Sequence, residues 1–568
     1  MKKVFIYILL LTAGMVACTE QNTPDNQGSS SGTGSVTDTT TTVTPTDTTI
    51  TTTDTIRIAW NGAAATVEGS NSGVEITSEN GYVTVNSTVK DITYILSGNG
   101  SGQLTIYGTN RHQLQLDGLT LVCSDGPAIN NQCKKSCFVV LNGTNSLSDG
   151  STYADSDEDR KAAFFSEGQI IFSGSGSLSV TGNYKHAIAS DDYIQFAEST
   201  GSLTLKAASD GIHANDGVYF DGGVFGITAG SDGVQCDSMI IVNGGELTIS
   251  AEGDGIQSDT ASITINGGAI TITNAGDKGI SAFADIIVTD GTIRVTSKYK
   301  CLKAGKKDDN DNVISAGNII ISGGDIQAIC TGTSSSGGGW GGWGSSSSDS
   351  SSPEGIEAKG TITITGGKVY SQSSDDAINA GGDLTVSGGC VCAYSTGNDG
   401  MDANGNMYIK GGLVYAICSG SPEVALDANT EGGKKLYVQG GTLVAIGGLE
   451  SGSSLTQSCY QASSWSKNTW YALTVGDEVF AFKTPSSGGS GIVVSGASTP
   501  TLKSGVSASG TAIFNGMAYY PATASSGSNV TLSSYSGGNS GGGPGGGGPG
   551  GGGPGGGPGG GPGGGGWW

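Results

Sequence analysis

The chain has few basic residues, few histidines and, within its repeats, no run suited to an α-helix. Its 568 residues include 26 Lys and Arg against 50 Asp and Glu, giving a formal net charge of −24. This charge argues against nucleic acid or an anionic membrane surface as partner, because both would repel the chain. Cations are the expected partners. The three histidines, His112, His186 and His213, lack the spacing of a zinc site.

A short motif recurs between Lys185 and Gly448. Its central glycines Gly211, Gly233 and Gly255 are 22 residues apart, and Gly-Gly pairs recur with nearly the same step. A period of this size indicates a solenoid. Four copies of the motif are Ser-Asp-Gly-Ile-His-Ala (209–214), Ser-Asp-Gly-Val-Gln-Cys (231–236), Gly-Asp-Gly-Ile-Gln-Ser (253–258) and Asn-Asp-Gly-Met-Asp-Ala (398–403).

The content of one period predicts the type of solenoid. Residues 210–229 hold three alternating apolar and polar runs, separated by Gly, Asn and Asp. Three short strands and three turns per period are typical of a parallel β-helix whose coils stack about 4.8 Å apart. We therefore expect an all-β protein, a right-handed parallel β-helix with three strands and about 22 residues per coil and about a dozen coils.

The first residues resemble a bacterial lipoprotein signal peptide. An apolar run from Val4 leads to Met15-Val16-Ala17-Cys18, which resembles a lipobox except that Met15 stands where Leu is preferred. The resemblance implies a mature chain lipid-anchored through Cys18 at the outer membrane or cell surface. The alternative is an ordinary secretory signal with a chance cysteine; either way the protein is exported.

Composition divides the rest of the chain. A Thr/Ser-rich stretch too polar to fold precedes a β-rich segment that should cap the open first coil. Hairpin-like runs follow the last repeat, and the Gly/Pro-rich end cannot form a core. The predicted divisions are a signal peptide (1–17), a linker (18–55), an N-terminal β cap and first coils (56–126), the β-helix (127–448) with a Ser/Gly/Trp insertion (331–352), a C-terminal β domain (449–535) and a disordered tail (536–568).

The cysteines after Cys18 are expected to be core residues. Cys330 and Cys418 follow their Gly-Gly pairs on the inward side of a strand, where cysteine acts as a small apolar side chain. A disulfide between some pair stays possible, but its pairing does not follow from the sequence.

Aligning the coils on the Gly of each motif places the preceding residues in one row, the leading column. Carboxylates stacked one coil apart would repel by roughly 3–4 kcal/mol at an effective dielectric of 20, so they need compensation. Their charges could be compensated by bound calcium, which accepts six to eight oxygen ligands, by neighbouring lysines, or by solvation alone. The leading column reads His186, Asp210, Asp232, Asp254, Lys278, Lys300, Glu354, Asp376 and Asp399.

A trailing column lies four residues after the same glycine. Asn and Asp are the usual turn residues of solenoids and tolerate a left-handed backbone, which accounts for most of this column. Its two carboxylates, Asp237 and Asp259, join Asp210, Asp232, Asp254, Asp376 and Asp399 as candidate metal ligands. The trailing column comprises Asn215, Asp237, Asp259, Asn404 and Asn429.

Two features are candidate ligand contacts. Lys300 and Lys303 belong to a basic run beside the acidic column and could meet an acidic polysaccharide together with calcium; solvated charges are the alternative. Trp340 and Trp343 in the inserted loop could stack on sugar faces, or the loop could be disordered decoration.

Four stretches follow one another in the chain: Leu-Gln-Leu-Asp-Gly-Leu-Thr-Leu (114–121), Gly-Pro-Ala-Ile-Asn (126–130), Leu-Asn-Gly-Thr-Asn-Ser-Leu-Ser-Asp-Gly (141–150) and the motif at 209–214. Together they resemble a bacterial carbohydrate-binding β-helix family. The resemblance implies a fold similar to that of calcium-dependent polysaccharide lyases, bound calcium, and attachment to cellulose or to acidic polysaccharides such as pectin. Lys278 and Lys300 depart from the pattern by standing where the motif would give Asp.

Three functions follow as hypotheses. The first is a surface lipoprotein that binds polysaccharide through a calcium-binding β-helix without catalysis. The second is a lyase acting on uronic acids, with calcium at the substrate carboxylate and Lys300 or Lys303 as the base. The third is a structural or adhesive stalk that makes its contacts through the tail.

Overall fold

The computed structural model describes residues 49–52, 54–308, 310, 312–333 and 352–537. The predicted signal peptide, Cys18, most of the linker, Trp340, Trp343 and nearly all of the tail lie outside the described residues. The described elements are all β-strands, which confirms the all-β class. Over these ranges no helix is long and apolar enough to cross a membrane.

A sheet of 14 strands forms one face of the repeat region. From β17 onward its strands are three residues long, with the first and third side chains buried, so the middle side chain points outward. Pairing is parallel except between β3 and β4. The strands are β3 (Val74–Glu79), β4 (Tyr82–Ser87), β6 (Gln103–Gly108), β8 (Ile129–Asn131), β11 (Ala162–Ser166), β14 (His186–Ser190), β17 (Ile212–Ala214), β20 (Val234–Cys236), β23 (Ile256–Ser258), β26 (Ile280–Ala282), β29 (Leu302–Ala304), β34 (Ile356–Ala358), β37 (Ile378–Ala380) and β40 (Met401–Ala403).

A second parallel ladder follows the first in each repeat. Its strands are rich in Ile and Val, whose branched side chains suit a pleated, half-buried surface. It comprises β1 (Asp54–Gly62), β5 (Ile92–Ser101), β7 (His112–Val122), β9 (Cys137–Asn142), β12 (Ile170–Ser173), β15 (Tyr193–Phe196), β18 (Gly217–Phe220), β21 (Met239–Val242), β24 (Ile263–Ile265), β27 (Ile286–Val288), β32 (Ile319–Ile321), β35 (Ile362–Ile364), β38 (Leu384–Val386), β41 (Met407–Ile409), β43 (Leu436–Val438) and β45 (Ser454–Leu455).

A third ladder holds the longer strands that follow the Gly-Gly pairs, and it ends in antiparallel pairings. It comprises β10 (Thr144–Ser148), β13 (Ser177–Gly182), β16 (Ser202–Ala207), β19 (Val224–Ala229), β22 (Glu246–Ala251), β25 (Ala269–Ala275), β28 (Thr292–Ser297), β33 (Asp325–Cys330), β36 (Lys368–Ser373), β39 (Cys390–Ser395), β42 (Leu413–Ile417), β44 (Thr442–Ile446), β49 (Ile492–Ser495), β46 (Cys459–Ala462) and β54 (Ser533–Tyr535).

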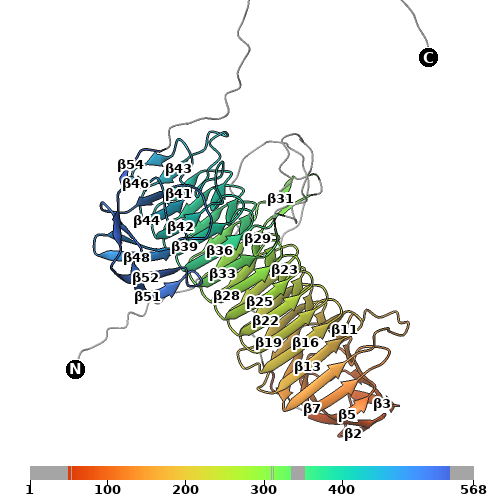
Figure 1. Ribbon diagram of the computed structural model, residues 1–568. Coiled ribbons are helices and arrows are strands. Elements are labelled where there is room, and N and C mark those ends of the chain that lie inside the picture. Colours follow the sequence, from red (N-terminus) through yellow and green to blue (C-terminus); the bar gives the residue numbers. More distant parts are fainter. Residues whose placement is uncertain (1–48, 53, 309, 311, 334–351, 538–568) are drawn as a thin grey trace, which may run out of the picture. The chain divides into compact units, whose positions relative to one another are not determined.

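The chain visits the three ladders in turn, so each repeat lies against the next (Figure 1). Ile212 pairs with Val234, and Val234 with Ile256, which keeps equivalent residues in register from repeat to repeat. These parallel ladders are those of a β-helix or solenoid. The right-handed sense stays a prediction.

One hydrophobic core runs through the repeats from Ile56 to Val493. Inward Ile, Leu, Val and Phe side chains of each repeat pack on those of the next, as in the stack of Phe172, Phe196 and Phe220 with ring centroids 5.1 Å apart. Cys330 and Cys418 are buried, as predicted. All ten cysteines in the described ranges are free thiols.

The second glycine of the Gly-Gly pairs adopts the left-handed backbone. Gly245 has φ 85° and Gly389 has φ 75°, and a Cβ on Gly389 would lie 2.6 Å from the carbonyl oxygen of Gly366. Only glycine fits such a close turn. The Asn and Asp residues of the trailing column do not use the left-handed backbone that they tolerate, because none of them has positive φ.

The two ends of the repeats carry extra strands. At the start, β1 pairs antiparallel with β2 (Ala64–Glu68), in the segment predicted to be a cap. Near the end, a separate sheet packs through Phe480 and Phe482 onto Tyr415 of β42. This sheet comprises β51 (Ser507–Ile513), β52 (Ala518–Ser525), β48 (Glu478–Lys483), β47 (Trp470–Val475), β50 (Thr501–Ser504) and β53 (Ser528–Val530), and the remaining hairpin is β30 (Lys306–Lys307) with β31 (Val313–Ser315).

Candidate functional site

The polar face of the 14-stranded sheet carries the predicted site residues in three rows. The strand register places the leading column as predicted, because Ile188, Ile212 and Val234 are aligned and each column member lies two residues earlier. Between the leading and trailing columns runs a third row, the strand column, formed by the outward middle residues of the short strands. The strand column comprises His213, Gln235, Gln257, Ser281, Lys303, Glu357, Asn379 and Asp402.

Carboxylates of the leading column bind the backbone of the next coil. Asp210 Oδ1 accepts the N–H of Asp232 at 3.1 Å, and Asp232 Oδ1 accepts that of Asp254 at 2.6 Å. The same bond joins Asp376 Oδ1 to the N–H of Asp399 at 3.1 Å. One oxygen of each carboxylate is therefore part of the fold, and a charge-assisted bond of this kind offsets some of the cost of its burial.

Asp210 also contacts two histidines. His186 Nδ1 lies 3.0 Å and His213 Nδ1 3.2 Å from Asp210 Oδ2. Burial alone would raise the pKa of Asp210, but its contacts with the two imidazoles hold this pKa well below its usual value. Burial lowers the pKa of His186. The histidines do not have the short spacing of a known zinc motif, so the sequence analysis did not pair them. Aligning the coils by their period would have shown that His186 and His213 stand in adjacent columns, one coil apart.

Asp232, Asp237, Asp254 and Asp259 form a carboxylate group over β20 and β23. Burial, and then the charges of Asp254 and Asp210, raise the pKa of Asp232 to about 7. Burial raises the pKa of Asp254 to about 6 even though Lys278 Nζ lies 3.7 Å away. The amide of Gln235 donates to Asp237 at 3.1 Å and to Asp259 at 2.7 Å, so these two are linked.

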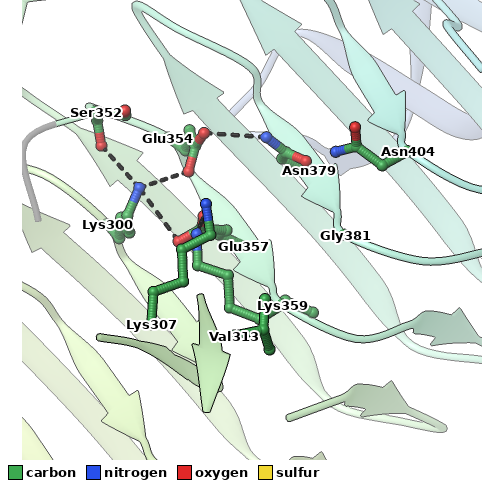
Figure 2. Close-up of a pocket in the computed structure, with 11 residues that line it drawn as sticks. Lys300, Lys307, Val313, Ser352, Glu354, Glu357, Lys359, Asn379, Gly381 and Asn404 are labelled. Carbon is green, nitrogen blue, oxygen red and sulfur yellow. Dashed lines mark hydrogen bonds and ion pairs between the residues drawn. The ribbon is translucent and has the colours of Figure 1, made fainter. Parts of the chain in front are cut away.

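Lys300 lies inside the protein. Its Nζ is 2.5 Å from Glu354 Oε2 and 3.2 Å from Glu357 Oε2, and its side chain is 1% exposed (Figure 2). Although burial alone would lower the pKa of Lys300, the two carboxylates raise it above its usual value. A buried, charged lysine of this kind is unsuited to abstract a proton. The buried Lys303 donates to the carbonyl of Gly305 at 3.1 Å.

A cavity of about 430 Å³ opens over this ion-pair cluster. Lys307, Lys359, Asn379 and Asn404 line it, as Figure 2 shows. Asn379 Nδ2 donates to Glu354 Oε1 at 3.0 Å. Arg294, which precedes these lysines in the sequence, lies on β28 of the third ladder and pairs with Asp325 at 2.8 Å.

A denser carboxylate group, the C-terminal acidic cluster, lies over β37 and β40: Asp376, Asp399, Asp402, Asp427 and Glu450. Burial first, and then neighbouring carboxylates, raise the pKa of Asp376 well above its usual value and that of Asp399 to about 7. The same causes raise the pKa of Asp402 to about 6. For Asp427, burial and the contact with Glu450 raise the pKa to about 8.

The sequence predicted only Asp376 and Asp399 of this cluster. Asp402 belongs to the strand column, which the sequence analysis did not search. Beyond β40 the sheet continues only as isolated bridges, in which Met401 pairs with Leu426 and Leu426 with Leu449. Asp427 and Glu450 directly follow these two leucines, where the sequence no longer shows the repeated motif. Extending the strand column by these bridges would have found them.

The comparison with protein families supports a carbohydrate-related assignment. The family described as "Carbohydrate-binding domain-containing protein" matches residues 79–322 and 281–400, together more than half of the 568 residues. No curated protein matches. A solved structure, the polysaccharide lyase-like protein from C. thermocellum as a gadolinium derivative, is similar with 23% identity and a TM-score of 0.38, over 41% of this chain and 96% of that chain. The chain thus belongs to the carbohydrate-binding domain-containing family.

Proposed function

We propose that this protein binds a polysaccharide along the polar face of the 14-stranded sheet, by means of bound calcium and without catalysing a reaction. The observation that carries the proposal is the C-terminal acidic cluster, which adjoins the cavity of Lys307, Lys359, Asn379 and Asn404. Membership of the carbohydrate-binding family supports the class of ligand.

Calcium suits the acidic cluster chemically. Asp376, Asp399, Asp402, Asp427 and Glu450 carry more oxygens than the six to eight that Ca²⁺ coordinates. In the described residues no three ligand atoms of this cluster lie within 4.8 Å of one another, so the carboxylates would have to close around the ion. Members of the cluster raise one another's pKa values because their negative charges repel. Once they ionise, a bound cation would offset this repulsion. The smaller group of Asp232, Asp237, Asp254 and Asp259 would hold a further ion.

The ligand we propose is cellulose or an acidic glycan such as pectin. Calcium can bridge a protein carboxylate and a sugar carboxylate, while the amides of Asn379 and Asn404 suit hydroxyl groups. The positive charge of Lys307 at the cavity favours an acidic polymer, whereas the ammonium group of Lys359 is already paired with the buried Glu357. Because equivalent side chains recur about every 4.8 Å along the stack, the face can contact several successive sugars.

The remaining parts of the proposal concern placement and fold. We place the protein at the bacterial surface, anchored through a lipid on Cys18, with the β-helix right-handed and three-stranded per coil. We favour binding over a lyase reaction, because Lys300 and Lys303, the two bases considered, are buried.

A retention assay tests this function. The protein is passed over insoluble cellulose and over immobilised polygalacturonate, with calcium and then with a chelator. We expect retention with calcium and loss of retention on the acidic polymer after chelation. The double variant Asp399→Asn/Asp402→Asn should be retained less, whereas Glu246→Gln, at an exposed carboxylate on β22 of the third ladder, should behave as wild type.

Three outcomes would contradict the proposal in whole or in part. Absence of binding to every polymer on a glycan array would end it. Chelator-resistant retention would remove calcium from it while leaving glycan binding. Absorbance of an unsaturated product released from polygalacturonate would show a lyase instead.

A further inference from the structure

Two imidazoles and one carboxylate converge between the coils of β14 and β17. His186 is the first residue of β14, His213 is the middle residue of β17, and Asp210 lies in the turn before β17. The imidazole rings stack with centroids 4.3 Å apart and planes at 21°. One ligand atom from each residue lies within 4.8 Å of the other two, in the part of the chain that the structure describes.

The donor set differs from the acidic groups of the same face. Calcium takes oxygen ligands, whereas imidazole nitrogen favours zinc and neighbouring transition metals. In a tetrahedral zinc site with bonds of about 2.0–2.1 Å, ligand atoms lie about 3.4 Å apart. Here His186 Nδ1 and His213 Nδ1 are 3.0 and 3.2 Å from Asp210 Oδ2, so these two distances need to open by only a few tenths of an ångström. The stacked rings must also turn, because a bound ion lies in the plane of each imidazole.

The surroundings define the coordination. The side chains of His186 and Asp210 are 9% and 8% exposed, which holds them in place, while that of His213 is 18% exposed and leaves one open side. A water molecule could complete four ligands there. The N–H of Asp210 also lies 3.3 Å from His186 Nδ1, so a metal ion would replace this hydrogen bond. The affinity should therefore be lower than that of a closed structural zinc site.

The repeat isolates what is special about this coil. One coil further along, Asp232 and Gln235 occupy the positions of Asp210 and His213. Asp210 has His186 before it in the leading column, whereas Asp232 has Asp210 before it. Asp232 therefore has no imidazole at the equivalent position.

We propose that His186, Asp210 and His213 form a binding site for a divalent transition metal such as Zn²⁺, which clips the coil of β14 to the coil of β17. The site is distinct from the calcium sites of the proposed function and does not depend on them. A metal that binds only the folded chain stabilises it by mass action.

Zinc titration of the chelator-treated, tag-free full chain tests the site. We expect one additional zinc ion per chain in a calorimetric titration run in the presence of calcium, and visible absorption bands of a nitrogen-ligated ion when Co²⁺ is used. The melting temperature should rise with zinc. The variants His213→Gln and His186→Asn should each lose the bound metal and the rise; Gln is the residue that the next coil carries, and Asn keeps an acceptor for the N–H of Asp210.

The matched control is Asp259→Asn, a carboxylate on the same face with no histidine contact, which should keep the zinc site. Circular dichroism and metal-free melting would verify that all variants fold. Zinc uptake that is absent in the folded wild type, or that stays at the wild-type level in both histidine variants, would overturn the proposal. Uptake lost in Asp259→Asn but kept in His213→Gln would assign the metal to the carboxylates and overturn it equally.

Discussion

The coils of β17 to β23 and the coils of β37 and β40 share a backbone geometry but differ in how their carboxylates are neutralised. In the first group, the chain supplies partners: two histidines for Asp210 and Lys278 for Asp254. In the second group, the charged neighbours of Asp376 and Asp399 are other carboxylates, which raise the pKa values of both residues. The same bond to the next coil thus serves a row in which Asp210 and Asp254, but not Asp232, have such partners within the chain, and a second row whose charged neighbours are other carboxylates.

Between the two regions lies Lys300, and its replacement should have the largest effect. Lys300→Met leaves the buried Glu354 without its ion-pair partner, while Glu357 keeps Lys359, and breaking a buried ion pair on one side costs about 3–5 kcal/mol. Denaturant unfolding measures this. Lys306→Met, at an exposed lysine nearby, should change stability by less than about 0.5 kcal/mol. Equal stability of the two variants would show that the lysine is not neutralising this cluster.

The second prediction concerns pH in the presence of a chelator. Asp232, Asp399 and Asp427 have pKa values raised to about 7, 7 and 8, so the folded state binds more protons than the unfolded state. Stability contributed at low pH is therefore lost as pH rises through 7 to 8. We expect the melting temperature to fall by about 3 °C between pH 6.5 and 8.5.

Calcium should remove most of this fall, since an ion bound to the ionised carboxylates stabilises the folded chain at high pH. The pH window avoids the buried His112 and His186, whose lowered pKa values act on stability mainly below pH 6.5. A melting temperature that is flat with pH in chelator would contradict the raised pKa values and, with them, the need for a cation.

The third prediction compares the two regions directly. Asp399→Asn should weaken calcium binding by on the order of tenfold, because it removes a charged oxygen ligand. Asp254→Asn should weaken it less, since Lys278 already offsets this charge. Calorimetric titration of calcium measures both. The reverse order would place the stronger site over β20 and β23.

The smallest effect is expected for Asp232→Asn. The amide oxygen can still accept the N–H of Asp254, while the loss of one charge relieves repulsion from Asp210 and Asp254. In chelator at pH 8, we expect a gain of about 0.5 kcal/mol in the free energy of unfolding. With calcium, the variant should bind less metal and lose that gain. A loss in chelator greater than about 2 kcal/mol would show that the carboxylate itself is required.

The period of the sequence predicts most of the fold, because a solenoid repeats the same local interactions. It places Asp210, Asp232 and Asp254 in one row, as the register shows. The environment of each row member depends on its neighbours across coils, which a single motif does not contain. The burial of Lys300 illustrates this, since Glu354 and Glu357 follow a long insertion in the sequence. The histidine pair escaped a search for short metal motifs for the same reason.

The bond from each leading carboxylate to the N–H of the next coil has a consequence for how such a chain can change over evolutionary time. Donor and acceptor occupy the same place in successive units, as with Asp232 and Asp254. A duplicated unit would therefore bring its own acceptor and meet a ready donor, and a deleted unit would leave its neighbours matched. Gene duplication can lengthen the array by whole coils without redesigning any junction, and each new coil would add one more carboxylate to the row.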